Sequence, residues 1–272
     1  MPRINCPEFE DQSWFPKPLR NMLTDYLQFI YAKSGIFDPL VPLLKRAFDQ
    51  SGARRLVDLC SGGGGPVPYL QHRLAAEGVM VEATLTDKFP NLAAFRRLCG
   101  EPGSQLSFVE HSVDASAVPE SLKGFRTLFT SFHHLPPGLA QKVLNDAVNS
   151  RQGIGVFEVN ERAAVAFFFN LLTPFFVLLG TPFIHPRRWQ RLLLTYVLPV
   201  VPLVTMWDGI ASNLRTYSLK ELERMTAATA ATPSLYNWEM GRIRARHGRR
   251  ITYLVGLPKA AGGEGPDTNS HG

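Results

Sequence analysis

The chain has 272 residues, a formal net charge of +6 and an apolar fraction of 45%, values typical of a globular protein. Its length suits one doubly wound α/β unit that carries an insertion. Much of the positive charge lies in two clusters, residues 185–191 and 242–250, so a general basic coat is absent. Neither cluster lies in a recognisable DNA- or RNA-reading module, and we expect no nucleic-acid partner.

The three cysteines, Cys6, Cys60 and Cys99, are widely separated and have no CxxC spacing. They indicate neither a disulfide framework nor a zinc site, and we expect no metal. No basic segment followed by an apolar run opens the chain, so no secretory signal is visible. A reducing, cytoplasmic setting is the simplest expectation.

Helical periodicity dominates residues 14–50 of the segment 1–50, where apolar side chains such as Leu19, Leu23 and Ile30 recur at three- and four-residue spacing. This segment is predicted to form an N-terminal helical cap. Packing against the core is the simpler role, and the alternative is a cover over one side of a nucleotide pocket.

Strand-like runs alternate with helical segments in the next part of the chain, which predicts a parallel sheet. These runs are 55–60, 81–86, 106–110, 127–131 and 154–159. Two later runs, 236–244 and 249–257, predict a terminal antiparallel hairpin. The predicted fold is therefore α/β: a doubly wound, mostly parallel seven-stranded sheet with N-terminal helices and an insertion between the fifth strand and the last helix.

These patterns divide the chain into further predicted parts: a core at 51–161, an insertion at 162–217, and the last helix and hairpin at 218–258. Ser218, followed by Glu221, has the spacing of a capping box and marks where regular structure resumes. The tail, 259–272, is rich in Gly, Pro and small polar residues and is predicted to be disordered.

Within the insertion, residues 163–184 and 192–207 carry no charge. The first run is long enough to cross a bilayer, but Pro174 and Pro182 interrupt it. A monotopic membrane anchor is favoured, because the turn at 187–189, with Arg191, suits anionic headgroups. The alternatives are a two-helix spanning hairpin and a dry lid over an apolar substrate. Anchor and lid both favour an apolar acceptor.

A glycine cluster follows the first strand directly and is the strongest motif in the chain. Residues 56–59 are an apolar strand around Asp58, and Gly62–Gly65 are four consecutive glycines. Glycines there allow positive φ angles and let a ligand approach bare backbone. Asp87 ends the second strand, where a carboxylate accepts hydrogen bonds from ribose hydroxyls. Asp114 and Ala115 follow the third strand, at the same edge of the sheet.

Over residues 58–257, apart from the insertion, the chain resembles the class I S-adenosylmethionine-dependent methyltransferases. Asp58-x-x-x-Gly62-x-Gly64 is similar to the first motif of that family. The resemblance implies S-adenosylmethionine as the cofactor, with an acid like Asp87 on the ribose and an acid like Asp114 beside the adenine. The cofactor-binding residues that it implies are Asp58, Gly62, Gly63, Gly64, Asp87, Asp114, Ala115 and Ser131.

The segment 132–136, Phe-His-His-Leu-Pro, is similar to the family segment in which the cofactor pocket meets the substrate. If the acceptor must lose a proton, His133 and His134 are the candidate catalytic bases, because imidazole titrates near neutrality. Adjacent residues of an extended segment point to opposite sides, which favours His134 over His133. Glu158, Asp208 and Tyr217 are the predicted substrate-binding residues.

The predicted function is methyl transfer from S-adenosylmethionine to a small acceptor that is apolar or membrane-associated. One alternative is a non-catalytic, membrane-associated S-adenosylmethionine-binding protein. Another is an NAD-dependent dehydrogenase, whose glycine fingerprint has a third glycine where this chain has Val67.

Overall fold

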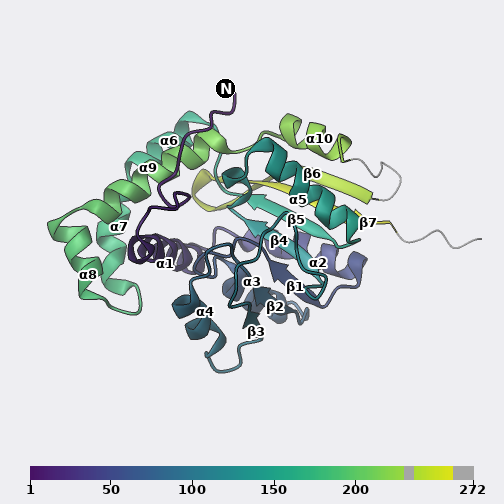
Figure 1. The fold of residues 1–272 in the computed structure, drawn as a ribbon, viewed down its shortest axis with the longest axis horizontal. Coiled ribbons are helices and arrows are strands. Elements are labelled where there is room, and N and C mark those ends of the chain that lie inside the picture. The colour runs from purple at the N-terminus through teal and green to yellow at the C-terminus, as the bar shows by residue number, and fades with distance from the viewer. Residues whose placement is uncertain (230–235, 260–272) are drawn as a thin grey trace, which may run out of the picture.

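A computed structural model describes residues 1–229 and 236–259, and within these ranges one seven-stranded sheet organises the protein (Figure 1). The strand order is β3-β2-β1-β4-β5-β7-β6, and β7 is antiparallel to both β5 and β6. The strands are β1 (Arg55–Asp58), β2 (Glu82–Leu85), β3 (Leu106–Phe108), β4 (Phe125–Phe129), β5 (Ile154–Glu158), β6 (Tyr236–Arg244) and β7 (Arg250–Pro258). The predicted fold class and terminal hairpin are confirmed. The predicted disorder of the tail falls on residues 260–272, which lie outside the described ranges.

Helices cover both faces of the sheet because successive strand residues are apolar on each side. Leu56 belongs to one buried cluster and its neighbour Val57 to the other. The first face is covered by α2 (Val41–Ser51), α3 (Val67–Ala76) and α4 (Leu92–Cys99). The second face is covered by α5 (Pro137–Asn149) and α10 (Leu219–Ala227). The expected capping box of Ser218 and Glu221 opens α10.

The fourth strand ends earlier than predicted. It stops at Phe129, because Thr130 adopts a positive φ of 50° and turns the chain out of the sheet. The next residues form a short 3₁₀ helix, η2 (Phe132–His134), instead of continuing in extended form. The two histidines therefore lie on a tight turn at the carboxyl edge of the sheet.

The first sixteen residues form a segment without a helix, and α1 (Lys17–Ser34) follows. We call residues 1–16 the N-terminal segment. It is fastened to the C-terminal end of the insertion by Ile4 N–H, which donates to Leu214 O at 3.0 Å, and by Arg3 Nε, which donates to Arg215 O at 2.6 Å. The predicted cap has two parts. Helix α2 packs in the core, whereas the N-terminal segment and α1 lie beside the glycine turn.

The insertion folds into helices that pack on α1, away from the sheet (Figure 1). They are α6 (Ala164–Leu171), α7 (Thr173–Gly180), η3 (Thr181–Phe183), α8 (Trp189–Leu192), the π-helix η4 (Leu193–Val197) and α9 (Val200–Arg215). Val177, Ile184 and Val201 form an apolar cluster with residues of α1. Arg191 is buried against Asp25 of α1, with Nη2 2.5 Å from Oδ2. The assignment of Arg191 to membrane headgroups is therefore wrong, because its charge is paired inside the protein.

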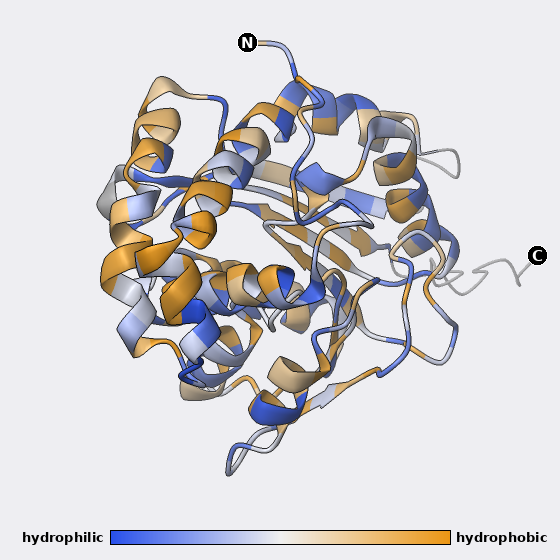
Figure 2. Cartoon of the chain, turned by 60° about the vertical axis from the view of Figure 1, so that its left-hand side comes forward, coloured by the Kyte–Doolittle hydropathy of each residue, from blue (hydrophilic) through white to orange (hydrophobic). Residues whose placement is uncertain are grey.

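Much of the outward surface of the insertion is apolar, as the hydrophobic colouring of its helices in Figure 2 indicates. We call this surface the outer face. Its exposed large side chains include Phe168, Leu171, Phe175, Leu179, Phe183, Trp189, Val197 and Leu203. In the described ranges no single helix has the length and apolar character to cross a bilayer. Two bent pairs pass that test of length and composition, α6 with 173–183 and 189–197 with α9.

The contact between α1 and the glycine turn yields a stability prediction. A Cβ on Gly63 would lie 2.8 Å from the backbone oxygen of Thr24, so Gly63→Ala must displace α1. We expect a loss of about 1–3 kcal/mol in the free energy of unfolding, measured by urea denaturation. Gly138→Ala is the matched control, because a Cβ there meets no atom of the described chain within 4 Å. It should be neutral or stabilise by up to about 1 kcal/mol, and equal losses in both variants would contradict the packing argument.

Candidate functional site

Asp58 holds the start of the glycine turn in place through hydrogen bonds to its carboxylate. Its side chain is buried, and its two oxygens accept hydrogen bonds from Thr127 Oγ1 and Ser61 Oγ, each at 2.7 Å. Burial raises the pKa of Asp58 to about 7. Because its oxygens are used in this way and it lies outside the lining of the cavity described next, Asp58 positions the turn and does not face a ligand.

A cavity of about 390 Å³ opens between the glycine turn and the N-terminal elements. Gly62, Gly63 and Gly65 line it, and we call it the first cavity. Asp87 also lines it, and its Oδ2 accepts the Gly62 N–H at 2.7 Å. Burial raises the pKa of Asp87. The predicted pairing of a glycine turn with an acid after the second strand is therefore present around one cavity.

Asp114 and Ala115 stand apart from the first cavity. Asp114 Oδ1 accepts bonds from the backbone N–H and the hydroxyl of Ser116, and its side chain is 47% exposed. Ala115 is buried in the core beneath. Neither residue is part of the lining of the first cavity in the described part of the chain. Their predicted place beside a cofactor is thus not reproduced, because the chain after β3 turns Asp114 back onto its own loop.

A second cavity, of about 210 Å³, adjoins the first. Apolar residues of α1 form one wall, and polar residues of the insertion, among them Asn170 and Thr205, form another. The residues that line both cavities are Glu10, Leu27, Tyr31, Thr130 and His134. Two compartments therefore meet at the carboxyl end of β4.

Two hydroxyl oxygens at this junction are buried, and that of Thr130 lies close to the hydroxyl of Tyr31. Thr130 Oγ1 and Ser131 Oγ have no hydrogen-bond partner among the described residues. Ser131 lines the first cavity, as predicted for a cofactor-binding residue, and Thr130 lines both. Buried hydroxyls are normally paired, so both are suited to bind a ligand that occupies the junction.

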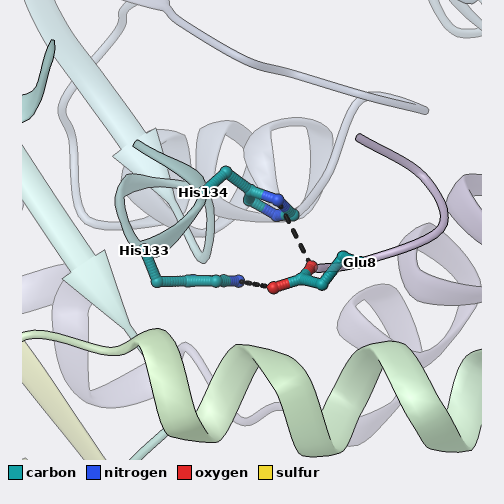
Figure 3. Close-up of side chains that lie close together, drawn as sticks. All are labelled: Glu8, His133 and His134. Atoms are coloured by element: carbon teal, nitrogen blue, oxygen red, sulfur yellow. Dashed lines mark ion pairs between the residues drawn. The ribbon is translucent and has the colours of Figure 1, made fainter. Parts of the chain in front are cut away.

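Both histidines of η2 point at one carboxylate, Glu8 of the N-terminal segment (Figure 3). His133 Nε2 lies 3.7 Å from Glu8 Oε1, and His134 Nδ1 lies 3.3 Å from Glu8 Oε2. The ring centroids of the histidines are 4.3 Å apart. The choice of His134 from strand alternation is therefore wrong in its premise, because the residues are helical and their side chains converge.

His133 is oriented by Glu158, at the end of β5. Its Nδ1 lies 2.8 Å from Glu158 Oε2, and its backbone N–H donates to Oε1 at 3.1 Å. Burial lowers the pKa of His133, which favours a neutral ring with its lone pair on Nε2. Glu158, predicted to contact the substrate, instead holds this histidine.

Three carboxylates surround the ring of His134. Asp11 Oδ1 lies 2.9 Å from Nδ1, and Glu10 Oε1 lies 3.5 Å from Nε2, in addition to the contact with Glu8. Burial alone would lower the pKa of His134, but these carboxylates raise it well above its usual value. In the absence of other ligands His134 is thus a cation, which makes it a poor general base at neutral pH.

Glu8, Glu10 and Asp11 were not predicted from the sequence. Their only signal is an acidic run just before the first helix, and nothing local connects that run to a histidine turn far along the chain. Asp208 of α9 makes the connection: its oxygens accept the backbone N–H of Phe9 at 2.8 Å and of Glu10 at 3.3 Å. Asp208 lines the second cavity, as predicted, and also fixes the N-terminal segment.

Tyr217 lies behind the histidine turn. Its ring packs on Phe132, and its hydroxyl donates to Leu135 O at 2.6 Å. It lines a separate cavity of about 180 Å³, together with Glu161. The structure therefore does not bring Tyr217 to the junction, and its position indicates support of the turn in place of substrate binding.

No protein-family model and no curated protein matches this chain. Among solved structures, the chain is similar to PigF with SAH, at 16% identity, with 89% of this chain and 62% of that chain covered and a TM-score of 0.50. It also aligns with LaPhzM at 13% identity, covering 84% of this chain and 56% of LaPhzM with a TM-score of 0.49, so it spans little more than half of that protein. The plantazolicin methyltransferase BamL, solved with a triazolic desmethylPZN analogue and SAH, aligns at 10% identity over 89% of this chain and 98% of that chain, with a TM-score of 0.48.

At these identities the similarity concerns the fold alone. The mostly parallel seven-stranded sheet with its C-terminal antiparallel hairpin is the α/β fold of the methyltransferases.

Proposed function

We propose that the protein is an S-adenosylmethionine-dependent methyltransferase whose acceptor is a small apolar molecule. The observation that carries this proposal is the pair of cavities that share a wall at the carboxyl end of β4. A group-transfer enzyme needs its donor and acceptor side by side in one orientation, and two joined compartments provide that.

The first cavity suits the donor. Its glycine turn presents backbone to a ligand, and Asp87 has lone pairs left for ribose hydroxyls. Ser131 supplies an unpaired hydroxyl at the junction, as the described residues leave it. PigF, whose fold is similar, is solved with SAH, the molecule that remains after S-adenosylmethionine gives up its methyl group.

The second cavity suits an acceptor with an apolar body and one polar group. Leu23, Tyr26 and Ile30 of α1 form its apolar wall, while Asn170 Nδ2 is a buried donor without a partner in the described chain. In the reaction, the acceptor heteroatom attacks the methyl carbon, and the carbon–sulfur bond breaks with its electron pair on sulfur. The acceptor's proton passes to Glu10, which lines both cavities and whose pKa is raised by burial.

Binding of the donor is tested with Asp87 and Asp114. Both were predicted to bind the cofactor, but only Asp87 lines the first cavity. We expect Asp87→Ala to weaken S-adenosylmethionine binding by about 1–3 kcal/mol in isothermal titration calorimetry, because ribose hydroxyls lose a charged acceptor. Asp114→Ala is the matched control and should bind like the wild type, since Asp114 lies outside the first cavity. Equal affinities for wild type and Asp87→Ala, or tighter binding of NADH than of S-adenosylmethionine, would refute this assignment.

We infer further that the outer face docks the protein on a membrane that supplies the acceptor. The insertion combines two roles that the sequence left as alternatives, because its inner side lines the second cavity while its outer face is apolar. Arg187 is exposed beside Trp189, an arrangement suited to anionic headgroups. Shallow insertion needs no spanning helix.

Membrane docking is tested by sedimentation with phosphatidylglycerol vesicles. Phe175 and Leu179 are 58% and 56% exposed on one side of α7, so replacing both with Ser should leave the fold intact. We expect vesicle binding to fall about tenfold or more, from the lost burial of two apolar side chains. Met80→Ser, at a site 55% exposed outside the insertion, should change nothing. A wild-type protein that stays in the supernatant would contradict docking and leave the insertion as a lid.

A further inference from the structure

Three potential metal ligands, Glu8, His133 and His134, converge beside the junction of the two cavities (Figure 3). One ligand atom from each lies within 4.8 Å of the others. Ligands that bind one ion through bonds of about 2.0–2.2 Å are separated by roughly 3–3.6 Å, so the observed contacts of 3.3 and 3.7 Å need little adjustment.

Several buried polar atoms of this cluster lack a hydrogen-bond partner in the described part of the chain, which indicates that the cluster binds a further group. Glu8 is fully buried and His133 nearly so, yet both carboxylate oxygens of Glu8 and Nε2 of His133 have no hydrogen-bond partner among the described residues. Arg215 Nη1 lies 3.2 Å from Glu8 Oε1, without the geometry of a hydrogen bond. Buried polar atoms are rarely left this way unless an ion or a water satisfies them.

The tautomer of His133 indicates what satisfies these buried atoms. Glu158 accepts a proton from Nδ1, so Nε2 carries a lone pair, and that lone pair faces an oxygen of Glu8. Two acceptors that face each other repel unless a positive group lies near both, and of these two atoms Arg215 contacts only the Glu8 oxygen in the described part of the chain, at 3.2 Å. A shared proton fits poorly, because 3.7 Å exceeds the length of a hydrogen bond. A cation bound by both atoms fits the spacing.

Each histidine also has a carboxylate on the side away from the shared point. Glu158 lies behind His133 at 2.8 Å, and Glu10 lies near Nε2 of His134 at 3.5 Å. Asp11 Oδ1 lies 2.9 Å from the Nδ1 of His134, so metal binding there would replace this contact. Histidines that bind metals characteristically donate their second N–H to such a carboxylate, which fixes the ring and makes the ligating nitrogen more basic.

We propose that Glu8, His133 and His134 bind a divalent first-row transition-metal ion at the edge of the acceptor cavity. Two imidazoles and one carboxylate suit Zn²⁺, Fe²⁺, Co²⁺ or Mn²⁺ better than Mg²⁺ or Ca²⁺, which favour oxygen ligands. Three protein ligands leave a position for substrate, as catalytic metal sites do. The ion's charge would also offset the carboxylates of Glu10, Asp11 and Asp208 around it.

The role of this ion rests on the proposed methyl transfer, whereas its binding does not. An ion held by Glu8, His133 and His134 would lower the pKa of an acceptor heteroatom bound to it, and Glu10, which lines both cavities, would be placed to accept the proton. His133 and His134 would then act as ligands, through Nε2 and Nδ1.

The test is metal binding by the full-length protein, with S-adenosylmethionine absent. After dialysis against a chelator, Zn²⁺ and Co²⁺ are titrated by calorimetry and by the visible spectrum of Co²⁺. We expect one tight site in the wild type, a loss of about 100-fold or more in affinity for Glu8→Gln and His133→Ala, and a loss of about 10–100-fold for Glu158→Gln. The exposed histidine variant His72→Ala is the matched control and should bind normally.

Circular dichroism shows whether each variant is folded, and Glu8→Gln keeps the shape of the side chain. Wild-type affinity no greater than that of Glu8→Gln, or no Zn²⁺ or Co²⁺ binding at all, would overturn the metal site. Metal binding without S-adenosylmethionine binding would instead keep the site and refute the proposed function.

Discussion

The buried carboxylate of Glu8 is the constraint on which the site depends. A carboxylate removed from water must be compensated, and His133, His134 and Arg215 are the positive or polarisable groups that surround it. Burial raises the pKa of Glu8, and the charges of His134 and Arg215 oppose that rise. The N-terminal segment, the turn after β4 and the end of α9 are therefore joined through one group. Loss of that group would separate the segment from the turn.

Besides its apolar surface, the insertion provides contacts that hold the N-terminal segment in place. Asp208 and Arg215 of α9 bind the N-terminal segment from one side, while Asp25 of α1 binds Arg191 of the insertion from the other. The wall of the second cavity thus consists of elements that hold each other in place. A buried ion pair such as Asp25–Arg191 adds little net stability against an apolar pair, but breaking it leaves an unpaired charge and is costly. The Asp25–Arg191 pair fixes the orientation of the insertion relative to the first cavity.

Sequence patterns predicted the features that arise locally. Strand periodicity gave the sheet and hairpin, and the strand–glycine–acid order located Gly62 and Asp87 beside one cavity. The two histidines were identified as candidates, but their turn was not, because the positive φ of Thr130 ends the strand without a glycine to signal it. Glu8 could not be connected to His133 from the sequence, since no periodicity links an irregular N-terminal segment to a distant turn. The side chain of Asp114 could not be oriented from the sequence for a similar reason: its loop bends back through bonds to Ser116.

The most direct measurement is transfer of a deuterated methyl group from labelled S-adenosylmethionine into a lipid extract of the source cells, followed by mass spectrometry. We expect the wild-type protein to produce a labelled product that is strongly reduced with Asp87→Ala at limiting S-adenosylmethionine, because donor binding is weakened, and absent with His133→Ala, which disables the acceptor side. A wild-type protein that binds S-adenosylmethionine but labels nothing would contradict methyl transfer to a lipid-soluble acceptor. Equal labelling by His133→Ala would contradict the placement of the reaction at the junction of the two cavities.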